Sequence, residues 1–271
     1  MIERRQMAIL AGLSVGTLTC FGWLLLCPHR ADCLNALTRF DTWVSAATTI
    51  VLPLGVASVA VWLALLAWRV LRVGFRLRAL PRTRELPAEL AAAMSRTGVR
   101  GVGSVAADAP TAFCAGAFRP FILVSEGLIN RLRPDELDAV LLHEQEHVRT
   151  FEPLIRAAHE TASDVFFYVP LVRWWSRRRL EDSELRADRV ALERLGPKPV
   201  AAALWALGRS TAIEGVAGFG GVAELRVAQV LGDALPTRAP GLPLVAISGM
   251  GTYLALQVAS CLVQAAQHLV L

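Results

Sequence analysis

Three residues near the middle of the chain, His143, Glu144 and His147, follow the order H-E-x-x-H. On a helix, histidines four residues apart stand about one turn above each other, so both imidazoles reach one ion about 2.0–2.1 Å from each nitrogen. Glu144 points about 100° around the axis, where it meets a water on the metal rather than the metal itself. The spacing predicts zinc ligation by the two histidines, with Glu144 as general base. A surface helix with this spacing by accident is the alternative.

A catalytic zinc site needs a third protein ligand. The longer pattern H-E-x-x-H-x-x-G-x-x-H is excluded, because Thr150 and Pro153 stand where it needs glycine and histidine. Residues 179–195 form a second helical pattern with Glu184 and Asp188 four apart on one face. We expect Glu184 to be the third ligand and Asp188 to accept the other N–H of a ligand histidine. The alternative is a solvated helix whose acids pair with its own arginines.

The helix that carries the two histidines is predicted over residues 133–149. Pro134 suits the first helical position, and two acidic residues follow in the first turn. Apolar side chains recur at helical spacing to bury one face, namely Leu137, Val140, Leu141 and Val148.

The two motifs together resemble the membrane-embedded gluzincin peptidases. Residues 117–129 and 135–144 are most similar to the BlaR/MecR type, the antibiotic-sensor peptidases that lead to cleavage of a repressor. The HtpX and CAAX-prenyl-protease type shares both metal motifs. The resemblance covers roughly residues 111–195. It departs at Glu152, where family members often carry aspartate, and in the large extracellular penicillin-binding domain of the sensor members. This sequence holds no such domain, so direct antibiotic sensing by the chain is not expected.

The resemblance implies an α+β gluzincin zinc-peptidase domain that binds one Zn²⁺ per chain. It implies a protein substrate, either a cytoplasmic repressor of the BlaI kind or the enzyme's own chain. An HtpX-like quality-control protease of membrane proteins and a non-catalytic membrane scaffold that retains the metal fold stay open as alternatives. The substrate, the activating signal and the oligomeric state are not determined by the sequence.

A β-hairpin is predicted from residues 111–118 and 121–125, which Arg119 and Pro120 separate. In similar peptidases an edge strand holds the substrate backbone by strand addition. The candidate residues for this strand are Phe113, Ala115, Ala117, Phe121 and Leu123. A purely structural hairpin is the alternative.

Arg226 and His159 are two further polar residues that could take part in the site. Arg226 could stabilise an oxyanion, although an exposed or salt-bridged arginine is the more common case. His159 follows the metal helix, and with the site already filled we expect it to be a packed or polar-face histidine.

A hydrophobic content of 54% and a mean hydropathy of +0.46, concentrated in uncharged runs, predict a membrane protein. We expect a mainly α fold with about three transmembrane helices, near residues 7–27, 45–68 and 240–271. The expected domains are an N-terminal transmembrane hairpin (1–80), the zinc peptidase (81–239) and a C-terminal span (240–271). Residues 164–175 place aromatics beside cations and are expected to lie at the membrane surface.

Charge and cysteines bound the remaining possibilities. The net charge of +5 is concentrated beside apolar runs, above all in residues 69–84, and indicates topology in the inner (plasma) membrane. The N-terminus and the catalytic domain are then cytoplasmic and the C-terminus is outside. No nucleic-acid fold motif is found, so direct nucleic-acid binding is not expected. Whether Cys27 and Cys33 form a bridge stays open.

Overall fold

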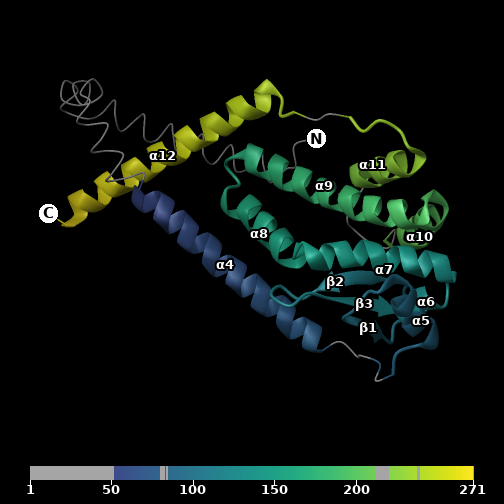
Figure 1. The fold of residues 1–271 in the computed structure, drawn as a ribbon. Coiled ribbons are helices and arrows are strands. Elements are labelled where there is room, and N and C mark those ends of the chain that lie inside the picture. The colour runs from purple at the N-terminus through teal and green to yellow at the C-terminus, as the bar shows by residue number, and fades with distance from the viewer. Residues whose placement is uncertain (1–51, 80–82, 84, 212–219, 237–238, 271) are drawn as a thin grey trace. The chain divides into compact units, whose positions relative to one another are not determined.

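The computed structural model describes residues 52–270 apart from 80–82, 84, 212–219 and 237–238 (Figure 1). The span expected near residues 7–27, together with Cys27 and Cys33, lies outside the described residues. The chain forms two compact units. The larger holds residues 66–161 and 175–239, and the other includes 162–174 and 240–271.

A three-stranded sheet lies at the base of the larger unit in its described part. Its strands are β1 (Val102–Val105), β2 (Ala112–Ala115) and β3 (Phe121–Ser125), in the order β1-β3-β2. β2 and β3 are antiparallel, so the predicted hairpin is present, while β1 is parallel to β3. β3 is therefore the central strand, and four of its five residues are buried.

Helix α7 (Pro134–Arg149) carries the H-E-x-x-H motif and packs on the sheet (Figure 1). Pro134 occupies the start of the helix, as predicted, and the carboxylate of Glu136 accepts the backbone N–H of Arg133 at 3.0 Å. Arg96 of α5 (Ala88–Thr97) forms two hydrogen bonds of 2.8 Å to Asp138. The core between α7, α5 and the sheet includes Leu90, Ile122, Val124, Leu128, Leu137 and Leu141. The helix that carries the H-E-x-x-H motif is therefore held in place at its N-terminal end.

Within the described part of the chain, four helices follow α7 before the C-terminal apolar helix. The chain reverses at Phe151, whose φ of 53° is left-handed, and then enters α8 (Glu152–Val165). The long helix α9 (Pro170–Leu195) carries both carboxylates of the second motif. Next come α10 (Pro197–Thr211), which contacts α7, and α11 (Gly220–Leu231), which contacts α10. The short helix α6 (Glu126–Ile129) joins β3 to the start of α7.

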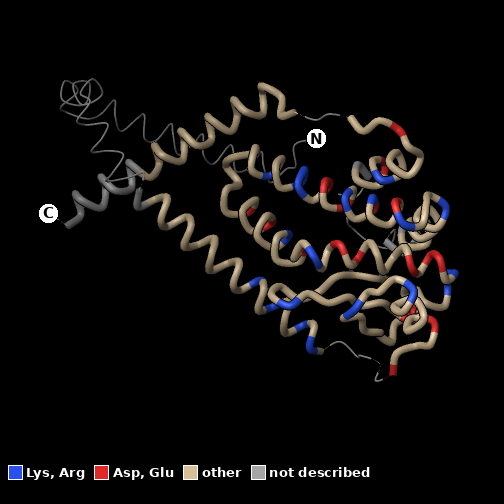
Figure 2. The backbone as a smooth tube through the Cα atoms, viewed as in Figure 1, with Lys and Arg blue, Asp and Glu red and all other residues tan. Residues whose placement is uncertain are grey.

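Two helices in the described residues are long and apolar enough to cross a membrane, α4 (Leu52–Arg78) and α12 (Leu242–Val270). α12 covers most of residues 240–271, where a C-terminal span is expected. α4 continues ten residues past the end predicted at Trp68, because apolar side chains keep their helical spacing between the arginines. Figure 2 shows that the basic residues of α4 gather toward its C-terminal end.

Residues 164–175, expected at a membrane surface, contain the end of α8, a turn and the start of α9, and their turn and the start of α9 pack on α12 within the smaller unit. The hydroxyl of Ser248 accepts the backbone N–H of Leu171 at 2.9 Å. Gly251 lies against the carbonyl of Tyr168 so closely that any Cβ there would collide with it. Ser248 and Gly251 of α12 therefore form the surface on which this turn packs.

Candidate metal centre

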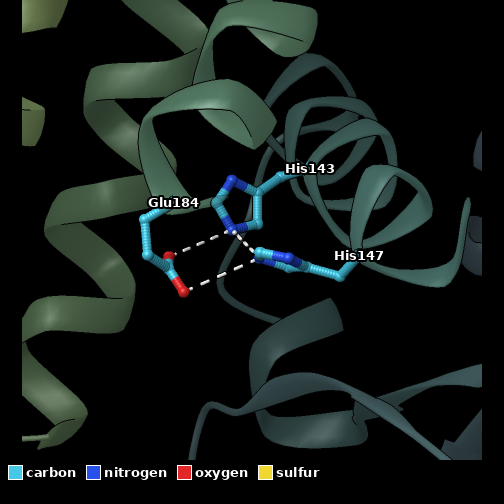
Figure 3. Close-up of side chains that lie close together, drawn as sticks. All are labelled: His143, His147 and Glu184. Atoms are coloured by element: carbon cyan, nitrogen blue, oxygen red, sulfur yellow. Dashed lines mark hydrogen bonds and ion pairs between the residues drawn. The ribbon is translucent and has the colours of Figure 1, made fainter. Parts of the chain in front are cut away.

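The imidazoles of His143 and His147 project from α7 toward the same point (Figure 3). Their Nε2 atoms are 3.0 Å apart, and the rings meet edge to face. The side chains are 12% and 7% exposed, so both histidines are largely shielded from water. The helical spacing has produced the convergence that the motif predicts.

Glu184 of α9 supplies a carboxylate at this point (Figure 3). Its Oε2 lies 3.5 Å from Nε2 of His143, and its Oε1 lies 3.7 Å from Nε2 of His147. Two atoms that bind one tetrahedral zinc ion at about 2.0–2.1 Å are separated by about 3.3 Å. The three distances observed here bracket that value. Two imidazoles and one carboxylate also form the donor set of known catalytic zinc sites, so these residues fit the ion.

Asp188 lies one helical turn beyond Glu184 and is 1% exposed. Its Oδ1 is 2.8 Å from Nδ1 of His143. A carboxylate at this position accepts the Nδ1–H of the imidazole and so leaves Nε2 with a free lone pair. The structure therefore places Asp188 where the sequence analysis expected a partner for a ligand histidine.

The two histidines have opposite pKa shifts. Burial alone would lower the pKa of His143, but the hydrogen bonds to Asp188 and Glu184 outweigh it and raise the pKa to about 9. Burial, together with the neighbouring His143, lowers the pKa of His147 to about 3. Burial opposes ionisation of Glu184 as well, yet the contacts with the two imidazoles and Arg226 hold its pKa below the usual range. The surroundings therefore favour a single positive charge on this pair of imidazoles, carried by His143.

Glu144 is 7% exposed and lies beside the imidazole pair on α7. Burial is the largest influence on its pKa and raises it, and the charge of Glu184 acts in the same direction. His143 opposes this shift, and so does a hydrogen bond from the backbone amide of Cys114 in β2. A carboxyl group with a raised pKa is suited to accept and return a proton near neutral pH.

The residues expected to bind substrate lie in three different places: in β2, in β3 and in the turn between them. Phe121 and Leu123 belong to the central strand β3, whose two edges are already paired, so they offer no free backbone. Ala117 lies in the turn after β2. This part of the expectation is corrected, because the sequence showed a hairpin but not the parallel strand β1 on its far side. β2 has an edge that faces away from β3.

The open edge of β2 is formed by different residues from those expected. Thr111 accepts the backbone N–H of Ser125 at 2.9 Å, and hydrogen-bonded pairs alternate along an antiparallel ladder. Phe113 and Ala115 therefore direct their backbone groups toward β3. Ala112 and Cys114 direct theirs toward the open edge.

Arg226 does not project free into the site. Its Nε and Nη2 donate to the two oxygens of Asp188 at 2.6 and 2.7 Å, and its Nη1 lies 3.2 Å from Oε2 of Glu184. The salt-bridged arginine, which was the alternative to an oxyanion role, is what the structure shows. This agrees with the more common case named from the sequence, but the sequence did not identify the partners, because the partners of an arginine on a distant helix leave no local pattern.

Two further results concern residues near the site. Arg156, which sequence reasoning missed, donates from Nη2 to Oε1 of Glu184 at 3.1 Å. Its spacing of four residues from Glu152 was the only signal, and it indicates no more than a helix surface pair. His159 lies outside the cluster and packs edge to face on Trp175, with ring centroids 4.8 Å apart.

Comparison with known proteins places this geometry in a family. No curated protein matches the chain. A family model described as the BlaR1 peptidase, M56, matches residues 30–200, a stretch that contains β1 to β3, both metal motifs and the apolar helix α4. The chain therefore belongs to the BlaR1 peptidase M56 family and is a membrane-associated metallopeptidase.

Proposed function

We propose that the chain is a zinc-dependent membrane endopeptidase that hydrolyses peptide bonds on the cytoplasmic side of the membrane. The observation that carries this proposal is the convergence of His143 and His147 of α7 with Glu184 of α9, all with donor atoms within 4.8 Å of one another. These three side chains would hold the ion. When bound, zinc polarises the scissile carbonyl and lowers the pKa of a water molecule toward 7.

The remaining chemistry belongs to the side chains around this point. Glu144 takes the proton of the attacking water and later delivers it to the leaving amine, a task that its raised pKa suits. Asp188 keeps Nε2 of His143 available by accepting from Nδ1 at 2.8 Å. Because Cys114 binds Glu144 through its backbone amide, the proton carrier is held beside the open edge of β2.

The substrate enters as an extended strand along β2. The outward backbone groups of Ala112 and the outward carbonyl of Cys114 support this role, because strand groups without a partner strand next to the metal helix can align a peptide by strand addition. Such binding selects unfolded or extended segments over folded ones. It agrees with a substrate that is a cytoplasmic repressor of the BlaI kind or the enzyme's own chain.

The cytoplasmic location is proposed from the arginines that follow the apolar part of α4. Arg69, Arg72, Arg76 and Arg78 all lie toward the C-terminal end of that helix. Positive residues beside a span are retained on the cytoplasmic side. The peptidase unit follows directly after them, so its site would face the cytoplasm of the plasma membrane.

The test uses the full chain, purified in detergent and loaded with zinc, with an unstructured fluorogenic peptide library as substrate. Glu144→Gln keeps the size of the side chain and removes its basicity. We expect its cleavage rate to fall by 10²-fold or more, in line with the loss of a general base, while zinc stoichiometry stays at the wild-type value. Exposed Glu193→Gln on α9 is the matched control. Cleavage by Glu144→Gln at the wild-type rate would refute the mechanism.

A further inference from the structure

Both carboxylate oxygens of Glu184 are held by arginines from helices outside the two motifs. Nη2 of Arg156, on α8, donates to Oε1 at 3.1 Å, and Nη1 of Arg226, on α11, lies 3.2 Å from Oε2. An ionised carboxylate offers about four lone-pair sites. With one site on each oxygen taken by an arginine, each oxygen keeps another for the imidazole pair, which both oxygens face (Figure 3).

Arg226 spans both carboxylates of α9 with one guanidinium. It forms a two-pronged pair with Asp188 through Nε and Nη2 and reaches Glu184 with its remaining nitrogen. The side chain of Arg226 is 20% exposed and that of Asp188 is 2% exposed. Planar, forked donors in a shielded place give directional bonds that a lysine cannot reproduce. Arg226 therefore fixes the relative positions of Glu184 and Asp188.

Arg156 is itself held by the contact between α8 and α9. Its Nη2 lies 3.6 Å from Oε1 of Glu152. The other oxygen of Glu152 accepts the hydroxyl of Ser183, the residue before Glu184, at 2.6 Å. Because Glu152 is only 4% exposed, this connection ties the start of α8 to the turn of α9 that carries the carboxylate.

We propose that Arg156 and Arg226 are positioning residues that clamp Glu184 from its two sides, so that the metal centre is assembled from four helices rather than two. This inference rests on the proposed metal site. α7 and α9 supply the donor atoms, and α8 and α11 hold the carboxylate in the orientation that points at the imidazoles. Without the clamp, Glu184 rotates away and the ion loses its third ligand for part of the time.

The docking of α11 adds a consequence. Gln229 donates from its side chain to the carbonyl of Leu185 at 2.8 Å, and Leu225 is buried. α11 is thus attached to α9 by Gln229 as well as by Arg226. The metal affinity of the peptidase then depends on a helix whose Arg226 lies 42 residues beyond Glu184 and which contributes no ligand of its own.

The experiment measures zinc affinity of the full chain in detergent by competition with a coloured zinc chelator. The variants are Arg226→Gln, Arg226→Lys and Arg156→Gln. Exposed Arg189→Gln, next to Asp188 on α9, is the matched control, and His147→Ala reports loss of the site itself. Substitutions around metal ligands typically cost 10–100-fold in affinity. We expect that loss for Arg226→Gln, a smaller loss for Arg156→Gln, partial recovery in Arg226→Lys and none in the control.

A second readout separates positioning from folding. The visible absorption of Co²⁺ bound in place of zinc reports the ligand geometry, and we expect it to change in Arg226→Gln and Arg156→Gln but not in Arg189→Gln. Wild-type affinity and an unchanged Co²⁺ spectrum in both clamp variants would overturn the proposal. If the wild type and His147→Ala bound zinc equally weakly, the metal site itself would be wrong. Equal losses in the control and the clamp variants would also overturn the clamp.

Discussion

Nδ1 of His143 and Oδ1 of Asp188 are 2.8 Å apart, at a contact from which water is almost entirely excluded. This contact joins the H-E-x-x-H motif of α7 directly to the Glu184–Asp188 pair of α9. It is separate from the link that a shared metal ion would make. Because of this contact, α7 and α9 must hold the two motifs at a fixed distance, although some forty residues separate the motifs in the chain.

Asp188→Asn tests that contact. The amide oxygen still accepts from His143, but the charge is lost, and the amide N–H groups face the donors of Arg226. We expect zinc affinity to fall about 10–100-fold in chelator competition with the purified chain. Exposed Asp182→Asn on the same helix should leave the affinity unchanged. Full affinity in Asp188→Asn would show that His143 needs no carboxylate partner.

Zinc removal should destabilise the wild type and not the variants that lack a ligand. A ligand that binds only the folded state stabilises it by about 2.7 kcal/mol at a concentration 100 times its Kd. We expect zinc to raise the thermal unfolding temperature of the wild type and chelation to reverse the rise, with little effect in His147→Ala. Glu184→Ala should lose most of the effect. If Glu184→Ala kept full zinc stoichiometry and the full shift, Glu184 would not be the third ligand.

The open edge of β2 can be tested with a backbone change. Ala112→Pro removes an N–H that points away from β3, so the sheet keeps its pairing while strand addition loses a donor. We expect kcat/KM for peptides to fall about 10-fold with zinc affinity retained. Phe113→Pro, which removes an N–H directed at β3, should instead destabilise the sheet. Unchanged kcat/KM in Ala112→Pro would remove β2 as the substrate strand.

The parts of the site that the sequence predicted are those that local geometry determines. His143 and His147 meet because any helix brings residues four apart onto one side. Glu184 and Asp188 share a face of α9 for the same reason, and the chemistry of a zinc site selects that pair. The hairpin of β2 and β3 was predictable from two strand-forming runs that Arg119 and Pro120 separate.

The parts that the sequence did not predict depend on contacts between distant elements. Arg226 was named from the sequence only as a candidate for an oxyanion role and Arg156 was not named, and nothing in the neighbourhood of either residue indicates a pairing with Glu184. Their partner Glu184 lies 28 residues from Arg156 and 42 from Arg226. The central place of β3 was missed similarly, because the parallel pairing of β1 with β3 joins segments that no short turn connects.

The thiol of Cys114 provides a test of burial beside Glu144. Burial is the largest cause that raises its pKa to about 12, and the charges of Glu144 and Glu152 add to it. At pH 8 a thiol of ordinary pKa near 8.5 is about one quarter thiolate, so alkylation of Cys114 should be on the order of a thousandfold slower. The measurement uses a variant with the other four cysteines changed to serine and compares native with denatured protein. Native labelling at the denatured rate would contradict the burial.

Topology is tested with reporters at the two ends of the peptidase unit. On the proposed topology, the arginines at the end of α4 keep the residues after Arg78 in the cytoplasm, and α12 would then carry the chain across the membrane. A reporter that is active only outside the cytoplasm should be active when fused after Leu271 and inactive when fused after Arg78. Replacing Arg69, Arg72, Arg76 and Arg78 with glutamine should weaken this preference, because the retained charge sets the orientation. An inactive reporter at Leu271, with the fusion protein present at the wild-type level, would contradict a crossing by α12 and with it the expected three spans.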